Sequence, residues 1–270
     1  MALLRWFSRW RRARAASRIE INDGIWAGVI GRLSFLRTLP GDDRQRLRDL
    51  VAAFLAEKSL HGAGGLELSE DMRLMIAAQA CLPILNLGLD WYDDWVEIIV
   101  YPDEFIVEHE YTDENGIVHR VREPRSGEAW EQGPVILSWV DAEAADGGDG
   151  YNVVIHEFAH KLDMRNGTAN GFPPLHAGMD RKRWTETFSA AYADFERRTE
   201  SWGGNEAEDS LIDDYAAEDP GEFFAVLSEV FFERPDVLHH DYPEAYRQLV
   251  LFYRQDPLAR LQAAGVAVSA

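Results

Sequence analysis

Residues 154–162 read Val-Ile-His-Glu-Phe-Ala-His-Lys-Leu and contain the pattern His-Glu-x-x-His. In a helix, residues four apart lie one turn apart on the same face, so His156 and His160 can reach one metal ion. Glu157 lies beside the first histidine and can hold a water molecule at the metal without filling a coordination position. Most other residues of the stretch are apolar, which favours a buried helix. The pattern therefore predicts one zinc ion per chain, with Glu157 as the general base.

A catalytic zinc site needs a third protein ligand and one open position. The metzincin pattern would place a glycine and a histidine three and six residues after His160, but Asp163 and Asn166 stand there. Glu222 is the better candidate, because it begins an apolar helix expected over residues 220–232. Three other histidines have no supporting pattern and are more typical of solvated or capping residues; they are His176, His239 and His240.

The helix expected over residues 220–232 carries a second carboxylate. Glu222, Ala225 and Glu229 share one of its faces. This spacing offers a metal ligand, a small residue that admits a neighbouring helix, and a carboxylate that can orient a ligating histidine. A half-exposed glutamate without a role at the metal is the alternative interpretation of Glu229, and the sequence leaves both open.

The elements around the motif change from helical to extended and back. Helical spacing first covers residues 25–39 and 47–55, and Ser69 is the expected N-cap of a helix that runs to about residue 87. Extended patterns follow at residues 95–101, 105–111, 117–121 and 134–140, with a hairpin turn signal at 113–116. Helices are then expected over residues 152–164, 181–198, 220–232 and 242–254. This order predicts an α+β fold, a helical bundle with a small mixed or antiparallel sheet and a zincin-like active-site helix of the gluzincin type. We expect the strand at 134–140 to lie beside that helix and to lend its edge to an extended peptide.

Composition limits the classes of partner. The net charge is -20 and 46% of the residues are hydrophobic, which fits a globular core and argues against nucleic acid as the main partner. No stretch approaches 18 uninterrupted apolar residues, so no transmembrane helix is expected. The single cysteine, Cys81, excludes an internal disulfide and is typical of a buried core thiol. A cytoplasmic location fits these features best.

The charged residues are unevenly distributed along the chain. Residues 1–18 hold six arginines and no acid. Apolar and aromatic residues alternate with these arginines, so contact with an anionic membrane is one interpretation, but a flexible basic tail that pairs with the acidic body is the one we favour. We therefore expect residues 1–24 to form a basic N-terminal segment.

Several stretches together resemble one protein family. They are Trp-Val-Glu-Ile-Ile-Val-Tyr-Pro-Asp-Glu-Phe at 95–105, Gly-Pro-Val-Ile-Leu-Ser-Trp-Val-Asp at 133–141, His-Glu-Phe-Ala-His-Lys-Leu-Asp-Met-Arg-Asn-Gly at 156–167, Asp-Tyr-Ala-Ala-Glu-Asp-Pro-Gly-Glu-Phe-Phe-Ala-Val-Leu-Ser-Glu-Val-Phe-Phe at 214–232 and Phe-Tyr-Arg-Gln-Asp-Pro at 252–257. In this order they resemble the Mlc titration factor A family of bacterial zinc peptidases. That resemblance implies a fold similar to the catalytic domain of anthrax lethal factor. Its extent implies a single zinc metallopeptidase domain at 25–257 and a C-terminal tail at 258–270.

The resemblance also implies roles for single residues. It implies that His156, His160 and Glu222 bind zinc and that Glu157 is the general base. Tyr215 matches the active-site tyrosine of the family, whose phenol can donate to the developing oxyanion. Without the resemblance, Tyr215 would be interpreted as a packing residue. The implied reaction is aminopeptidase-like hydrolysis of a peptide substrate.

Two other functions remain open at this point. The chain could be a regulatory binding protein that uses the zincin fold to sequester a transcriptional repressor, with weak hydrolysis. The metal could also be structural, which would require a fourth protein ligand, and the sequence offers no strong candidate.

Overall fold

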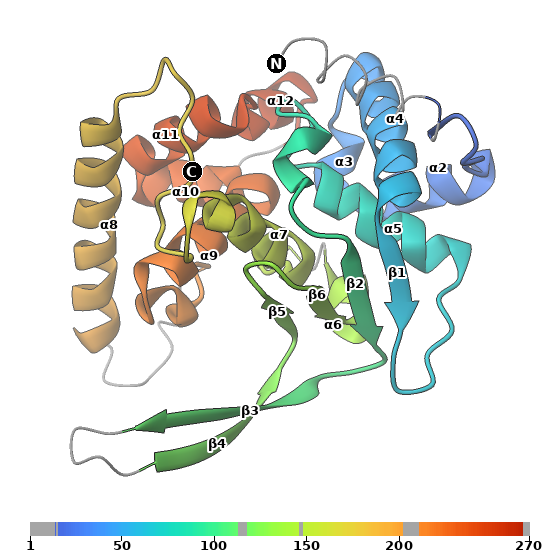
Figure 1. Ribbon diagram of the computed structural model, residues 1–270. Helices are drawn as coiled ribbons and strands as arrows, with labels where there is room; N and C mark the ends of the chain where they lie inside the picture. Colours follow the sequence, from blue (N-terminus) through green and yellow to red (C-terminus); the bar gives the residue numbers. More distant parts are fainter. Residues whose placement is uncertain (1–13, 15, 113–117, 146–147, 202–210, 267–270) are drawn as a thin grey trace.

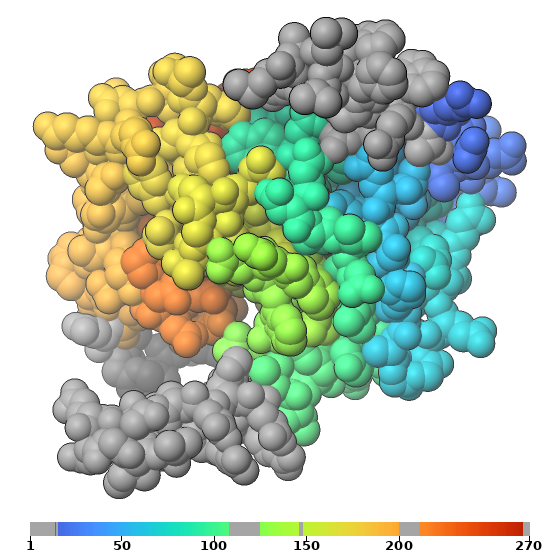
Figure 2. Space-filling model, in the orientation of Figure 1, coloured from blue at the N-terminus to red at the C-terminus, as the bar shows by residue number. Residues whose placement is uncertain are grey.

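A computed structural model describes the chain except residues 1–13, 15, 113–117, 146–147, 202–210 and 267–270. The helices lie in two groups on either side of a central helix, α7 (Val153–Asp163), and a small sheet (Figure 1). Figure 2 shows the same arrangement on the surface: the blue and the yellow-to-orange segments form the two sides of this face, and green segments lie between them. Most of the residues that suggested membrane contact, 1–13 and 15, lie outside the described residues.

The sheet has four strands in the order β1-β2-β6-β5, which are β1 (Ser59–Gly62), β2 (Glu97–Tyr101), β6 (Val135–Ser138) and β5 (Gly127–Ala129). The first three are parallel, with Ile98 of β2 opposite Leu60 of β1 and Val135 of β6. β5 runs antiparallel to β6, with Ala129 opposite Val135. The predicted α+β fold with a small mixed sheet is thus confirmed.

The strand expected over residues 134–140 is shorter than predicted and lies inside the sheet. β6 ends at Ser138, whose hydroxyl accepts from the N–H of Asp141 and caps α6 (Trp139–Ala144). β6 is paired on one side with β2 and on the other with β5. The prediction that it offers a free edge is therefore wrong. Among the described strands, β5 is the edge strand on this side of the sheet, and no strand was expected at residues 127–129.

A two-stranded hairpin projects from the body (Figure 1). It consists of β3 (Phe105–Thr112) and β4 (Val118–Arg125), which pair antiparallel from Phe105 opposite Arg125 outward. The expected hairpin is confirmed, although its turn signal at 113–116 lies outside the described residues. Ser126 alone separates β4 from β5.

The first helical group contains α2 (Asp23–Arg32), α3 (Ser34–Arg37), α4 (Gly41–Glu57) and α5 (Glu70–Cys81). Ser69 caps α5 by accepting from the N–H of Met72, as expected, but the helix ends at Cys81 rather than near residue 87. Cys81 is fully buried, which confirms its interpretation as a core thiol.

The second helical group follows α7 in the chain. It contains α8 (Arg181–Ser201), α9 (Pro220–Glu233), α10 (Pro235–Asp241), α11 (Pro243–Tyr253) and α12 (Pro257–Ala263). Within the described residues, no helix has both the length and the hydropathy of a membrane span.

α7 lies at the centre because both of its sides are covered. All its residues from Val153 to Asp163 are buried, as the apolar pattern predicted. The ring of Phe158 contacts those of Phe54, Tyr92 and Trp95, which come from α4 and the segment before β2. The histidine-bearing helix is therefore held between the sheet and the two helical groups.

Candidate metal centre

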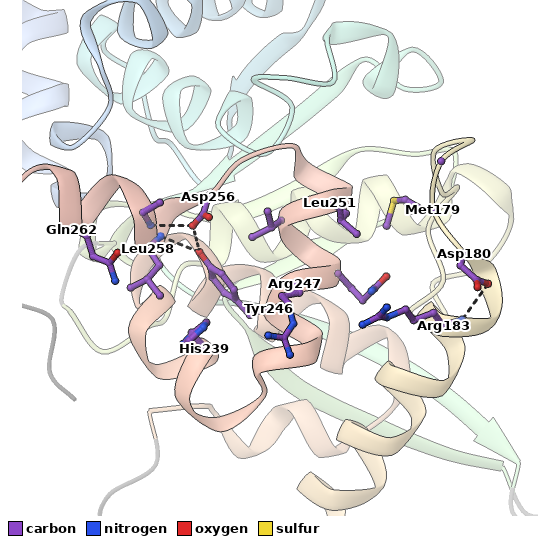
Figure 3. Close-up of a pocket in the computed structure, with 14 residues that line it drawn as sticks. Met179, Asp180, Arg183, His239, Tyr246, Arg247, Leu251, Asp256, Leu258 and Gln262 are labelled. Atoms are coloured by element: carbon purple, nitrogen blue, oxygen red, sulfur yellow. Dashed lines mark hydrogen bonds between the residues drawn. The ribbon is translucent and has the colours of Figure 1, made fainter.

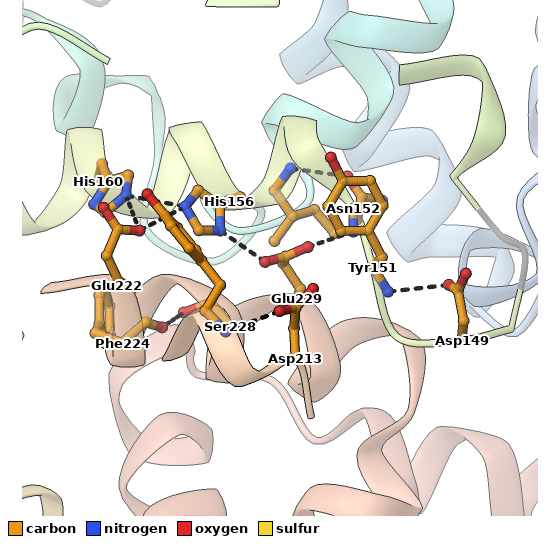
Figure 4. A network of polar contacts seen from close by, with 12 residues as sticks. Asp149, Tyr151, Asn152, His156, His160, Asp213, Glu222, Phe224, Ser228 and Glu229 are labelled. Carbon is orange, nitrogen blue, oxygen red and sulfur yellow. Dashed lines mark hydrogen bonds and ion pairs between the residues drawn. The ribbon is translucent and has the colours of Figure 1, made fainter. Parts of the chain in front are cut away.

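Helices α7 and α9 bring three predicted ligands to one point. Nε2 of His156 lies 3.0 Å and Nε2 of His160 lies 3.1 Å from the same carboxylate oxygen of Glu222. The two Nε2 atoms are 3.1 Å apart. Figure 4 shows both imidazoles directed from α7 toward the carboxylate on α9.

The donor set fits a metal ion. The ligand atoms of His156, His160 and Glu222 lie within 4.8 Å of one another, and no fourth such side chain joins them among the described residues. Two imidazoles and one carboxylate are the protein ligands of one class of catalytic zinc site, whereas structural sites have four protein ligands. The arrangement could therefore hold zinc in a catalytic rather than a structural site.

Glu229 contacts the far side of the first histidine. Its Oε1 lies 2.7 Å from Nδ1 of His156, and its other oxygen accepts from the backbone N–H of Asn152. Glu229 is only 2% exposed, so the alternative of a half-exposed glutamate is wrong. A carboxylate at Nδ1 fixes the tautomer that leaves Nε2 free to bind a metal.

The charged groups in this cluster change one another's pKa values. Burial alone would lower the pKa of His156, but Glu229 and Glu222 outweigh it and raise that pKa well above its ordinary value. Burial raises the pKa of Glu222, yet its hydrogen bonds to His156 and His160 hold it well below the usual range. Glu222 is thus a carboxylate at neutral pH, as a metal ligand must be.

The N-terminus of α7 is tied to two other helices through Asn152. Its side-chain oxygen caps α7 by accepting from the N–H of Ile155 at 2.9 Å. Its side-chain nitrogen donates to Glu233 of α9 at 2.7 Å and to Gln79 of α5 at 2.9 Å. Asn152 was not predicted as a site residue. The cap pattern could have indicated its position, but not its long-range contacts.

Glu157 lies between the metal ligands and the edge strand. Its side chain touches Gly127 of β5 so closely that a Cβ atom on that glycine would overlap the carboxylate. Burial raises the pKa of Glu157 to about 6, although His156 and His160 lower it. A carboxyl with a pKa in this range can both accept and return a proton near neutral pH.

Tyr215 lies in the short helix η3 (Asp214–Ala217). Asp213 caps η3 by accepting from the N–H of Tyr215 at 2.9 Å. The ring centroid of Tyr215 is 6.0 Å from that of His156. Burial and then the charge of Glu222 raise the pKa of the phenol, so it stays protonated and can donate a hydrogen bond.

These side chains line one cavity of about 580 Å³. Its walls come from β5, α7, η3 and α9, and they include all five residues predicted for the site: His156, Glu157, His160, Tyr215 and Glu222.

The other candidate histidines lie elsewhere. Nε2 of His176 is 2.8 Å from the carbonyl oxygen of Phe252, whose ring stacks on the imidazole. His239 lines a separate groove of about 710 Å³ beside α11, where its ring and that of Tyr246 are nearly perpendicular (Figure 3). Neither these two nor His240 belongs to the three-residue metal group among the described residues.

The sequence matches one protein family and several relatives that share a name. The family described as glucose-regulated metallo-peptidase M90 matches residues 7–254. The chain is 41% identical to Mlc titration factor A of Salmonella arizonae, over 89% of this chain and 94% of that protein. It is 40% identical to Mlc titration factor A of Cronobacter sakazakii, over 88% of each chain, and 39% identical to that of Escherichia coli O7:K1, over 85% of each.

Proposed function

The chain belongs to the glucose-regulated metallo-peptidase M90 family, and on that premise we propose that it is a zinc-dependent peptidase. One observation carries the proposal: two imidazoles and a carboxylate, from His156, His160 and Glu222, meet in a cavity beside the buried carboxyl of Glu157. Three protein ligands with an adjacent acid or base are what metal-assisted hydrolysis needs.

A zinc ion bound by the three ligands would polarise the scissile carbonyl and make water more acidic. Glu157 accepts the proton of the attacking water while the water oxygen bonds to the carbonyl carbon. It then gives that proton to the leaving nitrogen as the C–N bond breaks. Tyr215 donates to the oxyanion that develops on the former carbonyl oxygen.

The edge of β5 offers a place for the substrate main chain. Among the described strands β5 is paired only with β6, so an extended peptide can add to its other edge by backbone hydrogen bonds. The cavity wall also carries the acids Glu128, Asp213, Asp214 and Glu218, and Arg125 is the one arginine or lysine among its described residues. This charge favours a substrate with a free amine and supports an aminopeptidase-like activity.

A panel of peptide anilides tests the proposal. We expect the zinc-loaded protein to hydrolyse some of them, and hydrolysis to stop with a chelator and return with added zinc. Glu157→Gln should keep a full complement of zinc but lose activity by about 10²–10⁴-fold, because the proton acceptor is gone. Hydrolysis by this variant at a near wild-type rate would contradict the assignment of Glu157.

A second candidate function rests on the name of the relatives, Mlc titration factor A, which describes proteins that titrate Mlc. By analogy, this chain would sequester a transcriptional regulator, which also requires a cytoplasmic location. Calorimetric titration of the Glu157→Gln variant with purified Mlc tests this role apart from hydrolysis. Binding with a 1:1 stoichiometry would support it, and the absence of heat at micromolar concentrations would count against it.

A further inference from the structure

Lys161 follows a predicted metal ligand in the chain, but its side chain is used elsewhere. The residue is only 3% exposed. Its ammonium donates to the carbonyl of Trp130 and, at 2.9 Å, to the carbonyl of Gly133. These two carbonyls belong to the turn that joins β5 to β6. A buried ammonium therefore connects the active-site helix to the turn after the edge strand.

The turn itself is closed tightly. The N–H of Gly133 donates to the carbonyl of Trp130 at 3.2 Å, and the N–H of Trp130 donates to the carbonyl of Pro134 at 3.2 Å. A Cβ atom on Gly133 would lie 2.8 Å from Cβ of Trp130, so the turn has no room for a side chain there. Movement of the turn would therefore be passed on to the adjoining end of β5.

The other end of β5 meets α7 as well. Gly127 lies against Glu157, and Glu157 and Lys161 are four residues apart on α7. Residues at this spacing share one face of a helix, so α7 offers His156 and His160 to the metal and the next pair, Glu157 and Lys161, to β5. The three-residue edge strand is held against α7 at both ends.

We propose that Lys161 is a positioning residue that fixes the peptide-binding edge of β5 relative to the metal centre by clamping the β5–β6 turn onto α7. The clamp follows from the contacts alone, whereas its effect on substrates rests on the proposed function. β5 needs such support, because it has only three residues and pairs with a single described strand. Hydrogen bonds from a charged donor are stronger than those between neutral groups, so the ammonium of Lys161 can hold the turn in place.

Lys58 provides a matched control. It is also buried, at 7% exposure, and its ammonium donates to the carbonyls of Tyr92 and Trp95. The two ammonium groups lie 3.9 Å (Lys58) and 5.2 Å (Lys161) from the centre of the Trp95 ring. Each lysine thus donates to two carbonyls beside the same indole. The carbonyls that Lys161 contacts belong to the β5–β6 turn, whereas those that Lys58 contacts belong to the segment before β2.

The experiment compares Lys161→Met, Lys161→Arg and Lys58→Met in the full chain. Amide hydrogen exchange of residues 127–135 reports the clamp without any need for activity. We expect Lys161→Met to raise exchange there about tenfold or more, corresponding to at least one lost charged hydrogen bond. We also expect it to raise KM for a cleaved peptide more than it lowers kcat, at unchanged zinc content. Lys161→Arg keeps a charged donor, so its exchange at residues 127–135 and its KM should lie between those of Lys161→Met and the wild type.

Lys58→Met should lower the melting temperature but leave exchange at residues 127–135 and KM near wild type. Equal changes in both methionine variants would overturn the proposal and leave Lys161 an ordinary stabilising residue. Unchanged exchange in a folded Lys161→Met variant would also overturn it. If the methionine variant does not fold, Lys161→Gln, which removes the charge but keeps a polar side chain, takes its place with the same expected and contrary results. If the wild type cleaves no peptide, the proposed function fails, but the exchange data still decide whether the clamp exists.

Discussion

His156 contacts a carboxylate through each of its ring nitrogens. Nε2 faces Glu222 and Nδ1 faces Glu229, and these two glutamates lie seven residues apart on α9. Seven residues are close to two helical turns, so both carboxylates point from one face of α9 at one imidazole of α7. The same pair of helices therefore positions both the proposed ligand Glu222 and the carboxylate that supports His156.

Replacing Glu229 by glutamine tests this support. An amide can still contact Nδ1, but it no longer strengthens the imidazole as a ligand. We expect zinc affinity to fall by about 10–100-fold, the usual effect of losing a carboxylate behind a ligating histidine. Competition with a fluorescent zinc chelator measures the change.

Glu233→Gln is the matched control, since Glu233 is a second buried carboxylate one turn further along α9. Its carboxylate accepts from the side-chain nitrogen of Asn152, so its removal should change stability with little effect on zinc affinity. Equal losses of zinc affinity in both variants would show that the contact to Nδ1 has no special role.

Residue by residue, the sequence predicts some of the site and misses other parts. The four-residue spacing predicts that His156 and His160 share a face, and helical spacing makes Glu222 and Glu229 candidates. Tyr215 lies in a single turn of helix without any periodic pattern, and only the family resemblance indicates it. Asn152 and Lys161 were not predicted, because their partners are distant in sequence and leave no local signal.

At the level of elements, β5 was not predicted because it is three residues long. Gly-Glu-Ala at 127–129 has neither alternation nor β-branched residues, which are the usual signals of a strand. Its pairing with β6 and its contacts with α7 determine its conformation. The neighbouring β6 was predicted, but its apolar run of residues does not reveal whether it lies inside a sheet or at its edge.

The close approach of β5 to α7 predicts the effect of Gly127→Ala. The new Cβ atom would overlap the carboxylate of Glu157, so the strand or the carboxylate must move. Because a misplacement of about 1 Å can cost about 10²-fold in rate, we expect a loss of this order in kcat/KM. Zinc content should stay unchanged.

Gly28→Ala serves as the control for this substitution. Gly28 lies in α2, and a Cβ atom there would meet nothing within 4 Å. This variant should keep full activity and gain up to about 1 kcal/mol of stability, because alanine favours helices over glycine. Full activity of Gly127→Ala in the same assay would mean that the position of β5 is not critical.

At the scale of the whole molecule, the candidate metal centre joins parts of the chain that are far apart. α7 and α9 are separated by α8 and the segment after it, and Asn152 also links them to Gln79 of α5. The sequence predicted α5, α7, α8 and α9 in this order. It predicted neither β1, where no strand was expected, nor the parallel pairing of β1, β2 and β6, because such pairing depends on contacts between distant segments.

Metal removal should therefore lower the stability of the entire fold. A ligand present at about 100 times its dissociation constant stabilises the folded state by about 2.7 kcal/mol. For a chain of this size that corresponds to roughly 5–10 °C in melting temperature. Differential scanning calorimetry with zinc and with a chelator measures the shift. Glu222→Ala lacks one ligand, so its melting temperatures with zinc and with a chelator should be nearly equal. A shift as large as in the wild type would mean that zinc binds at another site.

The central claim is that His156, His160 and Glu222 hold a catalytic zinc ion. Anomalous diffraction at the zinc absorption edge, from crystals of Glu157→Gln grown with zinc and a peptide, tests it most directly. We predict one strong anomalous peak bonded to both Nε2 atoms and to the carboxylate of Glu222, with the peptide lying along β5 and no fourth protein ligand. A peak at another site, or a fourth protein side chain bound to the metal, would contradict the claim.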